Sequence, residues 1–187
     1  MTASIQILDH WSSPNLSVTI AGVPGNRRHP GNGGLRLMSY ADDAAAQAEA
    51  RILAERMQLK HAIYTTGFAG IKVVARASNV EGCKPKLLAV VAEMLNAHAG
   101  TLYTGCDLNI GLDDVETLYQ ATPYVLAALN SPVNPSAATG HGVASSFEAA
   151  LRVLPLTGAP DVRSALFHGV GAVGSTVAHR LVRLGLK

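Results

Sequence analysis

Apolar and polar residues follow two different periods along this chain, and these periods predict a series of strands and helices. Short segments in which apolar residues alternate with small or polar ones are typical of strands, whereas apolar residues three or four positions apart are typical of helices. Strands are expected at residues 16–22, about 70–76, 101–105 and 165–171. Helices are expected at residues 40–58, about 85–98, 112–120, 141–154 and 172–185. This alternation of strands and helices predicts an α/β fold.

Residues that favour caps and turns mark the ends of several of these elements. Asp42 or Asp43 is expected to cap the first helix. Asp113, which has an acidic residue three positions later, has the pattern of a capping box for the helix over residues 112–120. Two loops are expected, at residues 23–34, which are rich in Gly, Pro and Arg, and at residues 130–140.

The stretch GAPDVRS, residues 158–164, indicates a seam between two domains, because a new apolar segment begins directly after it. We therefore expect a first domain over residues 1–157 and a second over residues 163–187. One strand and one helix cannot bury both faces of a parallel strand. The second domain is therefore expected to be incomplete, and to be completed by another chain or by further sequence.

Composition and charge exclude several classes of partner. The 187 residues are 48% hydrophobic, which is enough to support a packed core. Only 15% are charged, the formal net charge is +2, and no basic cluster is longer than Arg27-Arg28, so binding to nucleic acid or to an anionic membrane is not expected. No apolar run is long enough to span a membrane. Small molecules and like subunits are the expected partners.

The cysteine content indicates a reducing environment. Cys83 and Cys106 are too few for a disulfide framework, and neither has the spacing of a zinc site. We expect a cytoplasmic protein without a metal site.

Residues 169–174, GVGAVG, match the GxGxxG pattern of dinucleotide-binding turns. They follow an apolar segment and open a helix, where glycines permit a tight turn and close approach of a pyrophosphate. The candidate cofactor contacts are Gly169, Gly171, Ala172, Val173 and Gly174. The acidic residue that binds the ribose lies about 20 residues further on in such domains, beyond the last residue of this sequence. A glycine-rich turn without a ligand is the alternative interpretation.

Lys72 is a lysine within an apolar strand, which is costly unless its charge is paired or its pKa falls. Lys60, Lys72 and Asp107 each lie at an element boundary, where side chains from different strands can converge. A desolvated lysine can act as a base near neutral pH, and a second, charged lysine can hold a substrate carboxylate. Two lysines and one carboxylate suit amino-acid chemistry. The alternative is that each is a surface residue or forms a structural salt bridge.

From about Gly33 onward the chain resembles the Glu/Leu/Phe/Val dehydrogenase family, and within it the leucine, valine and phenylalanine dehydrogenase branch. The elements that carry the resemblance are GGLR, MQLKHA, AGIK, YTGCDLNIG, NPSAATGHGV and GVGAVGSTVAHRL, in matching order and spacing. The resemblance implies a first domain with a mixed sheet and helices on both faces, followed by the first βα unit of a Rossmann domain. It also implies homo-oligomers that form through the first domain.

The resemblance also implies roles for individual residues. Gly33 and Gly34 would line the substrate site, and Lys60 would bind the substrate α-carboxylate. Lys72 would be the base that activates water, and Asp107 would exchange protons with the amino group. Thr139 would lie beside the substrate or the nicotinamide.

The implied reaction is oxidative deamination of an apolar L-amino acid to a 2-oxo acid and ammonia, with NAD, or NADP in its place, as the cofactor. Asn32 occupies the position where glutamate dehydrogenases carry a lysine, which disfavours a glutamate substrate. Family members continue through the rest of the Rossmann domain, which is absent from these residues. The alternative function is therefore a non-catalytic or split-subunit module for oligomerisation or binding.

Overall fold

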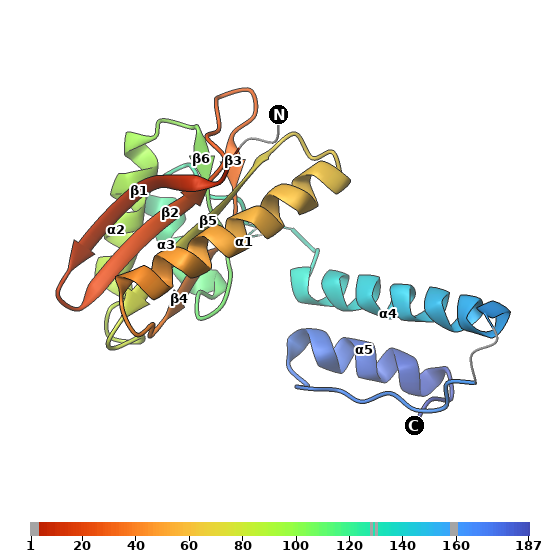
Figure 1. The fold of residues 1–187 in the computed structure, drawn as a ribbon. Helices are drawn as coiled ribbons and strands as arrows, with labels where there is room; N and C mark the ends of the chain where they lie inside the picture. The colour runs from red at the N-terminus through yellow and green to blue at the C-terminus, as the bar shows by residue number, and fades with distance from the viewer. Residues whose placement is uncertain (1–3, 128, 130, 158–160) are drawn as a thin grey trace. The chain divides into compact units, whose positions relative to one another are not determined.

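The computed structural model describes residues 4–127, 129, 131–157 and 161–187. They form two compact units, Met1–Leu129 and Asn130–Lys187 (Figure 1). No helix in these described ranges is long and apolar enough to cross a membrane.

The first unit contains a mixed sheet, which confirms the predicted α/β class. In the described residues the sheet has six strands in the order β1-β2-β5-β3-β6, and β4 also pairs with β5. The pairs β1/β2 and β2/β5 are antiparallel, while β3 and β4 run parallel to β5, and β3 parallel to β6. The strands are β1 (Gln6–Ser13), β2 (Leu16–Gly22), β3 (Gly31–Asn32), β4 (Leu35–Met38), β5 (Ala69–Ala77) and β6 (Leu102–Tyr103).

Helices cover both faces of this sheet (Figure 1). Helix α1 (Asp43–Ile63) packs on one face through alanines spaced four residues apart, Ala46, Ala50 and Ala54, which contact Ala21 and Val74. Helices α2 (Lys84–Ala97) and α3 (Leu112–Ala121) belong to the larger apolar core on the other face. Side chains alternate along β5, since Ile71, Val73 and Ala75 enter the larger core and Val74 faces α1. This alternation places Lys72 on the face that α1 covers.

Two predicted helix starts have different outcomes. Asp42 caps α1, as its carboxylate accepts a hydrogen bond of 2.7 Å from the backbone N–H of Ala45. The predicted cap at Asp113 is wrong, because α3 begins at Leu112 with Gly111 at its N-cap. The carboxylate of Asp114, the third residue of the helix, accepts a hydrogen bond from the Gly111 N–H instead. The N-cap lies two residues earlier than predicted, so Asp114 takes the position in the capping box that Glu116 was predicted to take.

The expected loop over residues 23–34 contains the short strand β3, which pairs with both β5 and β6. A strand of one glycine and one asparagine has no apolar alternation, so the pattern of the sequence could not reveal it. Strands β1 and β4 were also not predicted; β1 is a half-exposed edge strand with many polar residues.

The second unit consists of α4 (Pro135–Val153), a short 3-10 turn (Leu154–Thr157) and α5 (Ala172–Arg183). Ala144 of α4 packs with Val177 and Leu181 of α5. The prediction of a loop up to residue 140 is wrong, because Asn134 caps α4 and Pro135 occupies its first turn.

The predicted strand over residues 165–171 is also not formed, because no described strand lies beside it for pairing. Instead, Ala165 donates a backbone hydrogen bond to Lys187, which donates one to Arg163. Residues 158–160 of the predicted seam lie outside the described residues. The assignment of domains to residues 1–157 and 163–187 stays a prediction, although α4 packs with α5 within the second unit.

Candidate active site

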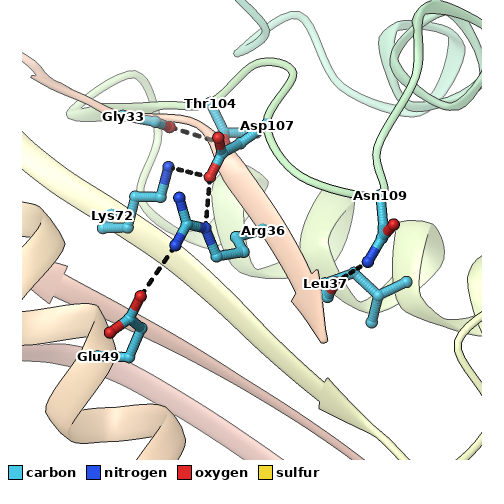
Figure 2. Close-up of polar contacts among 8 residues, drawn as sticks. All are labelled: Gly33, Arg36, Leu37, Glu49, Lys72, Thr104, Asp107 and Asn109. Carbon is cyan, nitrogen blue, oxygen red and sulfur yellow. Dashed lines mark hydrogen bonds and ion pairs between the residues drawn. The ribbon is translucent and has the colours of Figure 1, made fainter. Parts of the chain in front are cut away.

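The predicted residues Lys72 and Asp107 form an ion pair on the sheet face that α1 covers (Figure 2). The Lys72 side chain is only 7% exposed, and its Nζ atom lies 2.6 Å from Oδ2 of Asp107. Lys72 is carried by β5, whereas Asp107 lies in the loop that follows β6. Residues 35 positions apart are thus brought into contact by the parallel strands between them.

Arg36 completes this charge cluster and was not among the predicted site residues. Its Nε atom donates to the same Asp107 oxygen at 2.8 Å, and its Nη1 atom donates to Glu49 at 2.9 Å (Figure 2). Leu35 and Leu37 of β4 enter the larger core, so Arg36 between them faces α1, which carries Glu49. The arginine stands in the GGLR element, but the spacing of the sequence gave no reason to pair it with Asp107.

Burial and neighbouring charges perturb the acid–base properties of the ion pair. Burial lowers the pKa of Lys72, the contact with Asp107 opposes this, and the charges of Arg36 and Lys60 lower the pKa further. For Arg36, the hydrogen bond and charge of Asp107 outweigh the effect of burial, so its pKa is raised. A lysine with a lowered pKa loses its proton more readily than an exposed one, as a general base requires.

Gly33 and Gly34 allow the chain to pass closely over β5 and the loop before Asp107. A Cβ atom on Gly33 would lie 1.8 Å from the backbone oxygen of Ile71. One on Gly34 would lie 2.6 Å from the backbone oxygen of Cys106 and 3.0 Å from Cβ of Asp107. The Gly33 carbonyl accepts a hydrogen bond of 2.9 Å from the Thr104 hydroxyl (Figure 2). Only glycine fits these two positions without a shift of the backbone.

Lys60 lies in the last turn of α1, near enough for its charge to affect Lys72. Within the part of the chain that the structure describes, its ammonium group has no hydrogen bond or ion pair. The exposed side chain is therefore available to a ligand.

His61, the next residue, is buried and fixes this end of α1. Its Nε2 atom donates to the Asn32 carbonyl at 3.1 Å, so in the neutral ring Nδ1 accepts from the Thr66 hydroxyl at 2.7 Å. The helix end that carries Lys60 is thus tied to the residue directly before Gly33. Sequence reasoning did not single out His61, although its place beside Lys60 in MQLKHA was a usable signal.

The remaining predicted site residues lie in the second unit. Thr139 is exposed in the second turn of α4 and donates its hydroxyl hydrogen to the Pro135 carbonyl. Gly169 has a φ of 92°, a left-handed conformation that favours glycine. A Cβ atom on Gly174 would lie 2.5 Å from the Gly169 oxygen, whereas one on Gly171 would meet nothing within 4 Å.

The predicted cofactor contacts surround the N-terminus of α5. Gly171 is the N-cap, and Ala172 and Val173 are the first two helical residues. The turn packs tightly against the helix at Gly174 and leaves the backbone around Gly171 open. A phosphate group fits such a turn, because the backbone N–H groups of the first helical turn lack intrahelical acceptors.

Metal ligands and disulfides were not expected. The described residues contain no group of three or more His, Cys, Asp or Glu side chains placed to hold a metal ion. Cys83 and Cys106 are both free thiols.

The chain is similar in sequence and in structure to known amino-acid dehydrogenases. No protein-family model matches it. Over 172 residues it is 30% identical to the L-tryptophan dehydrogenase of Nostoc punctiforme, a match that covers 92% of this chain and 48% of that protein. A crystal structure of L-tryptophan dehydrogenase from the same organism matches with a TM-score of 0.65 and 26% identity, covering 98% of this chain and 52% of that one. These matches confirm the resemblance of this chain to the amino-acid dehydrogenases of the Glu/Leu/Phe/Val dehydrogenase family.

Other amino-acid dehydrogenases match over a similar extent. The leucine dehydrogenase of Bacillus subtilis is 25% identical over 155 residues, which cover 81% of this chain and 43% of that protein. The Leu-bound form of the hetero-hexameric glutamate dehydrogenase from Thermus thermophilus shares the fold, with a TM-score of 0.69 and 23% identity, over 96% of this chain and 48% of that one. The chain thus spans about half the length of the family members that it matches.

The ion pair at Asp107 is expected to make folding pH-dependent. Burial alone would raise the pKa of this carboxyl group, but hydrogen bonds from Arg36 and Lys72 outweigh burial and lower the pKa. Such a group stabilises the fold above its unfolded pKa of about 4, and the contribution is lost as the pH falls through the folded pKa.

We therefore expect Asp107→Asn to reduce the free energy of unfolding most at neutral pH. The difference from the unchanged chain should narrow as the pH falls from about 4 through the lowered folded pKa of Asp107, below which the carboxyl group of the unchanged chain is also neutral. Urea unfolding at a series of pH values measures this difference. A difference that stays constant down to the acid limit would contradict the assignment.

Proposed function

We propose that this chain takes part in the NAD(P)-dependent oxidative deamination of an apolar L-amino acid to a 2-oxo acid and ammonia. The observation that supports this most is the buried Lys72, paired with Asp107 beside the close-packed Gly33 and Gly34. A lysine with a lowered pKa next to an open, charged Lys60 has the two functions that this chemistry needs from a protein: a base and a carboxylate-binding group.

Each residue has a proposed role. Lys60 would bind the α-carboxylate of the substrate, and Gly33 and Gly34 would form the surface against which the substrate lies. Asp107 would exchange protons with the substrate nitrogen. Neutral Lys72 would take a proton from water as the water attacks the carbon of the imine, so that ammonia leaves and the 2-oxo acid forms.

The second unit would supply the cofactor contacts. Gly169, Gly171, Ala172, Val173 and Gly174 would hold the phosphates of NAD or NADP at the start of α5, and Thr139 would lie beside the substrate or the nicotinamide. A bound nicotinamide would accept the hydride that leaves the substrate Cα. The fit of the residues supports this, since the tight contact at Gly174 and the open backbone at Gly171 are both present.

The substrate class and assembly are also proposals. Asn32 offers no positive charge for a second carboxylate, which favours an apolar side chain over glutamate. The names of the tryptophan and leucine dehydrogenases support the same class. We propose a cytoplasmic homo-oligomer, and the hetero-hexameric assembly of the glutamate dehydrogenase from Thermus thermophilus supports an oligomer.

A non-catalytic module for oligomerisation or binding is the second candidate. The outer surface of α1 favours it, because Ile52, Leu59 and Ile63 are 47%, 61% and 66% exposed.

The deciding experiment is the formation of reduced nicotinamide by the purified chain, followed by its ultraviolet absorbance. Leucine, valine, phenylalanine and tryptophan would each be offered with NAD or NADP, and glutamate would serve as the control substrate. Turnover of apolar amino acids above that of glutamate is the expected result. A folded chain that turns over none of them with either nucleotide would overturn the proposal in favour of the non-catalytic module.

A further inference from the structure

Two cations share a single oxygen of the Asp107 carboxylate. Lys72 donates to Oδ2 at 2.6 Å and Arg36 donates to the same atom at 2.8 Å (Figure 2). A carboxylate oxygen accepts two such hydrogen bonds readily, and charge-assisted bonds of this kind are short and strong. Hydrogen bonds from side chains on two strands, β5 and β4, therefore fix the position of this oxygen.

Arg36 is itself held in place by a second acid. Its Nη1 atom donates to Glu49 of α1 at 2.9 Å, while Nε is directed to Asp107. The guanidinium group is planar and its donors have fixed directions, so contacts at two of its nitrogens define its orientation. With side-chain exposures of 21% for Arg36 and 32% for Glu49, this contact is partly protected from solvent.

From this geometry we propose that Arg36, anchored by Glu49, is a positioning residue that holds the Asp107 carboxylate between two cations, so that Lys72 does not bind this carboxylate alone. The inference deepens the proposed function and rests on it for its catalytic consequence. Arg36 acts through Asp107 and is not itself placed against the substrate.

The charged groups that affect Lys72 come from three elements: Asp107 from the loop after β6, Arg36 from β4 and Lys60 from α1. Asp107 stabilises the charged form of Lys72, whereas Arg36 and Lys60 destabilise it. Without Arg36, Lys72 would lose a repelling charge and would no longer share the carboxylate. Its ammonium form would then be stabilised, and the neutral base would be present only at higher pH.

The test combines Arg36→Gln, Arg36→Lys and Glu49→Gln with a matched control, Arg76→Gln. Arg76 faces the same helix and its Nε atom donates to Asp43 at 2.6 Å, with a side-chain exposure of 18%, but it does not contact Lys72 or Asp107. The titration of Lys72 is followed by NMR of chains with ¹³C-labelled lysine, and its signal is identified by its loss in Lys72→Met. The pH profile of kcat/KM is measured in parallel.

In Arg36→Gln we expect the titration midpoint of Lys72 to move to higher pH. We also expect kcat/KM at neutral pH to fall by about tenfold or more, with the loss shrinking as the pH rises. Glu49→Gln should also raise the Lys72 midpoint and lower kcat/KM, but by less. For Arg36→Lys, both quantities should lie between those of Arg36→Gln and those of the unchanged chain. Arg76→Gln should lower stability only.

An unchanged Lys72 midpoint in folded Arg36→Gln and Glu49→Gln would overturn the proposal and leave Arg36 a purely structural residue. The titration needs no enzyme activity, so it separates this inference from the proposed function. A chain without dehydrogenase activity in which the midpoint still moves would refute the proposed reaction and support the placement of Asp107 by Arg36.

Discussion

Lys72→Met is expected to reduce kcat for amino-acid oxidation by about a thousandfold, because the positioned general base is removed and general acid–base catalysis contributes factors of about 10² to 10⁴. The fold should tolerate this substitution. Methionine is close to lysine in length and suits a side chain that is only 7% exposed, and Asp107 keeps its hydrogen bond from Arg36. The measurement is initial rates at saturating substrate, with circular dichroism to confirm the fold.

Lys86→Met is the matched control for this result. Lys86 lies on α2 with its ammonium group 5.2 Å from the centre of the Trp11 ring, remote from the ion pair. It should retain near-normal rates. Equal rates for Lys72→Met and Lys86→Met in an active chain would exclude Lys72 as the base.

Gly33→Ala is expected to destabilise the first unit severely, by about 3 kcal/mol or more, which is the range for substitutions that overpack a core or displace the backbone. The added Cβ atom would lie 1.8 Å from the backbone oxygen of Ile71, and a backbone atom on a central strand cannot move aside as a flexible side chain can. Thermal unfolding measures the change as a fall in Tm. Because Gly33 joins β3 to β4, the strain would also displace the segment that carries Arg36.

Gly111→Ala tests whether this loss is specific to the close approach. Gly111 is the N-cap of α3, its φ is −87°, and an added Cβ atom would meet only an Asp114 oxygen at 3.9 Å. Its substitution should change stability by less than about 1 kcal/mol. Similar falls in Tm for Gly33→Ala and Gly111→Ala would mean that β3 and β5 are less closely packed than described.

The sequence predicted the parts of the fold whose apolar pattern is strong. Strand β2 was predicted at its observed bounds, and β5, α1 and α2 within a few residues. The short strands β3 and β4 were missed. β3 has no apolar pattern and forms through pairing with β5 and β6, and the alternation in β4 extends over only four residues. Residues 165–171 show the opposite error. They have the apolar pattern of a strand, but an apolar segment without a neighbouring strand does not form a ladder.

The sequence predicted the two central residues of the candidate site, but not the residues that hold them in place. A lone lysine in an apolar strand needs a partner for its charge. The sequence grouped Lys72 with Lys60 and Asp107, and the structure places Asp107 in contact with Lys72. Their catalytic roles stay predictions. Arg36 and Glu49 could not be selected from the sequence, because their importance comes from contacts made across 71 and 13 positions of the chain. For His61, the place beside Lys60 was the one signal that the sequence offered.

The alanines on the side of α1 that faces the sheet limit which substitutions this helix can accept. Ala46, Ala50 and Ala54 are at most 1% exposed, so any longer side chain at these positions must lift the helix away from the sheet. Glu49 and Lys60 are on the same helix and would move with it. Ala50 touches no charged group of the site. A larger residue in its place would nevertheless move both Glu49, which anchors Arg36, and Lys60, which is proposed to bind the substrate carboxylate. Variation in substrate preference should accordingly arise outside these three positions.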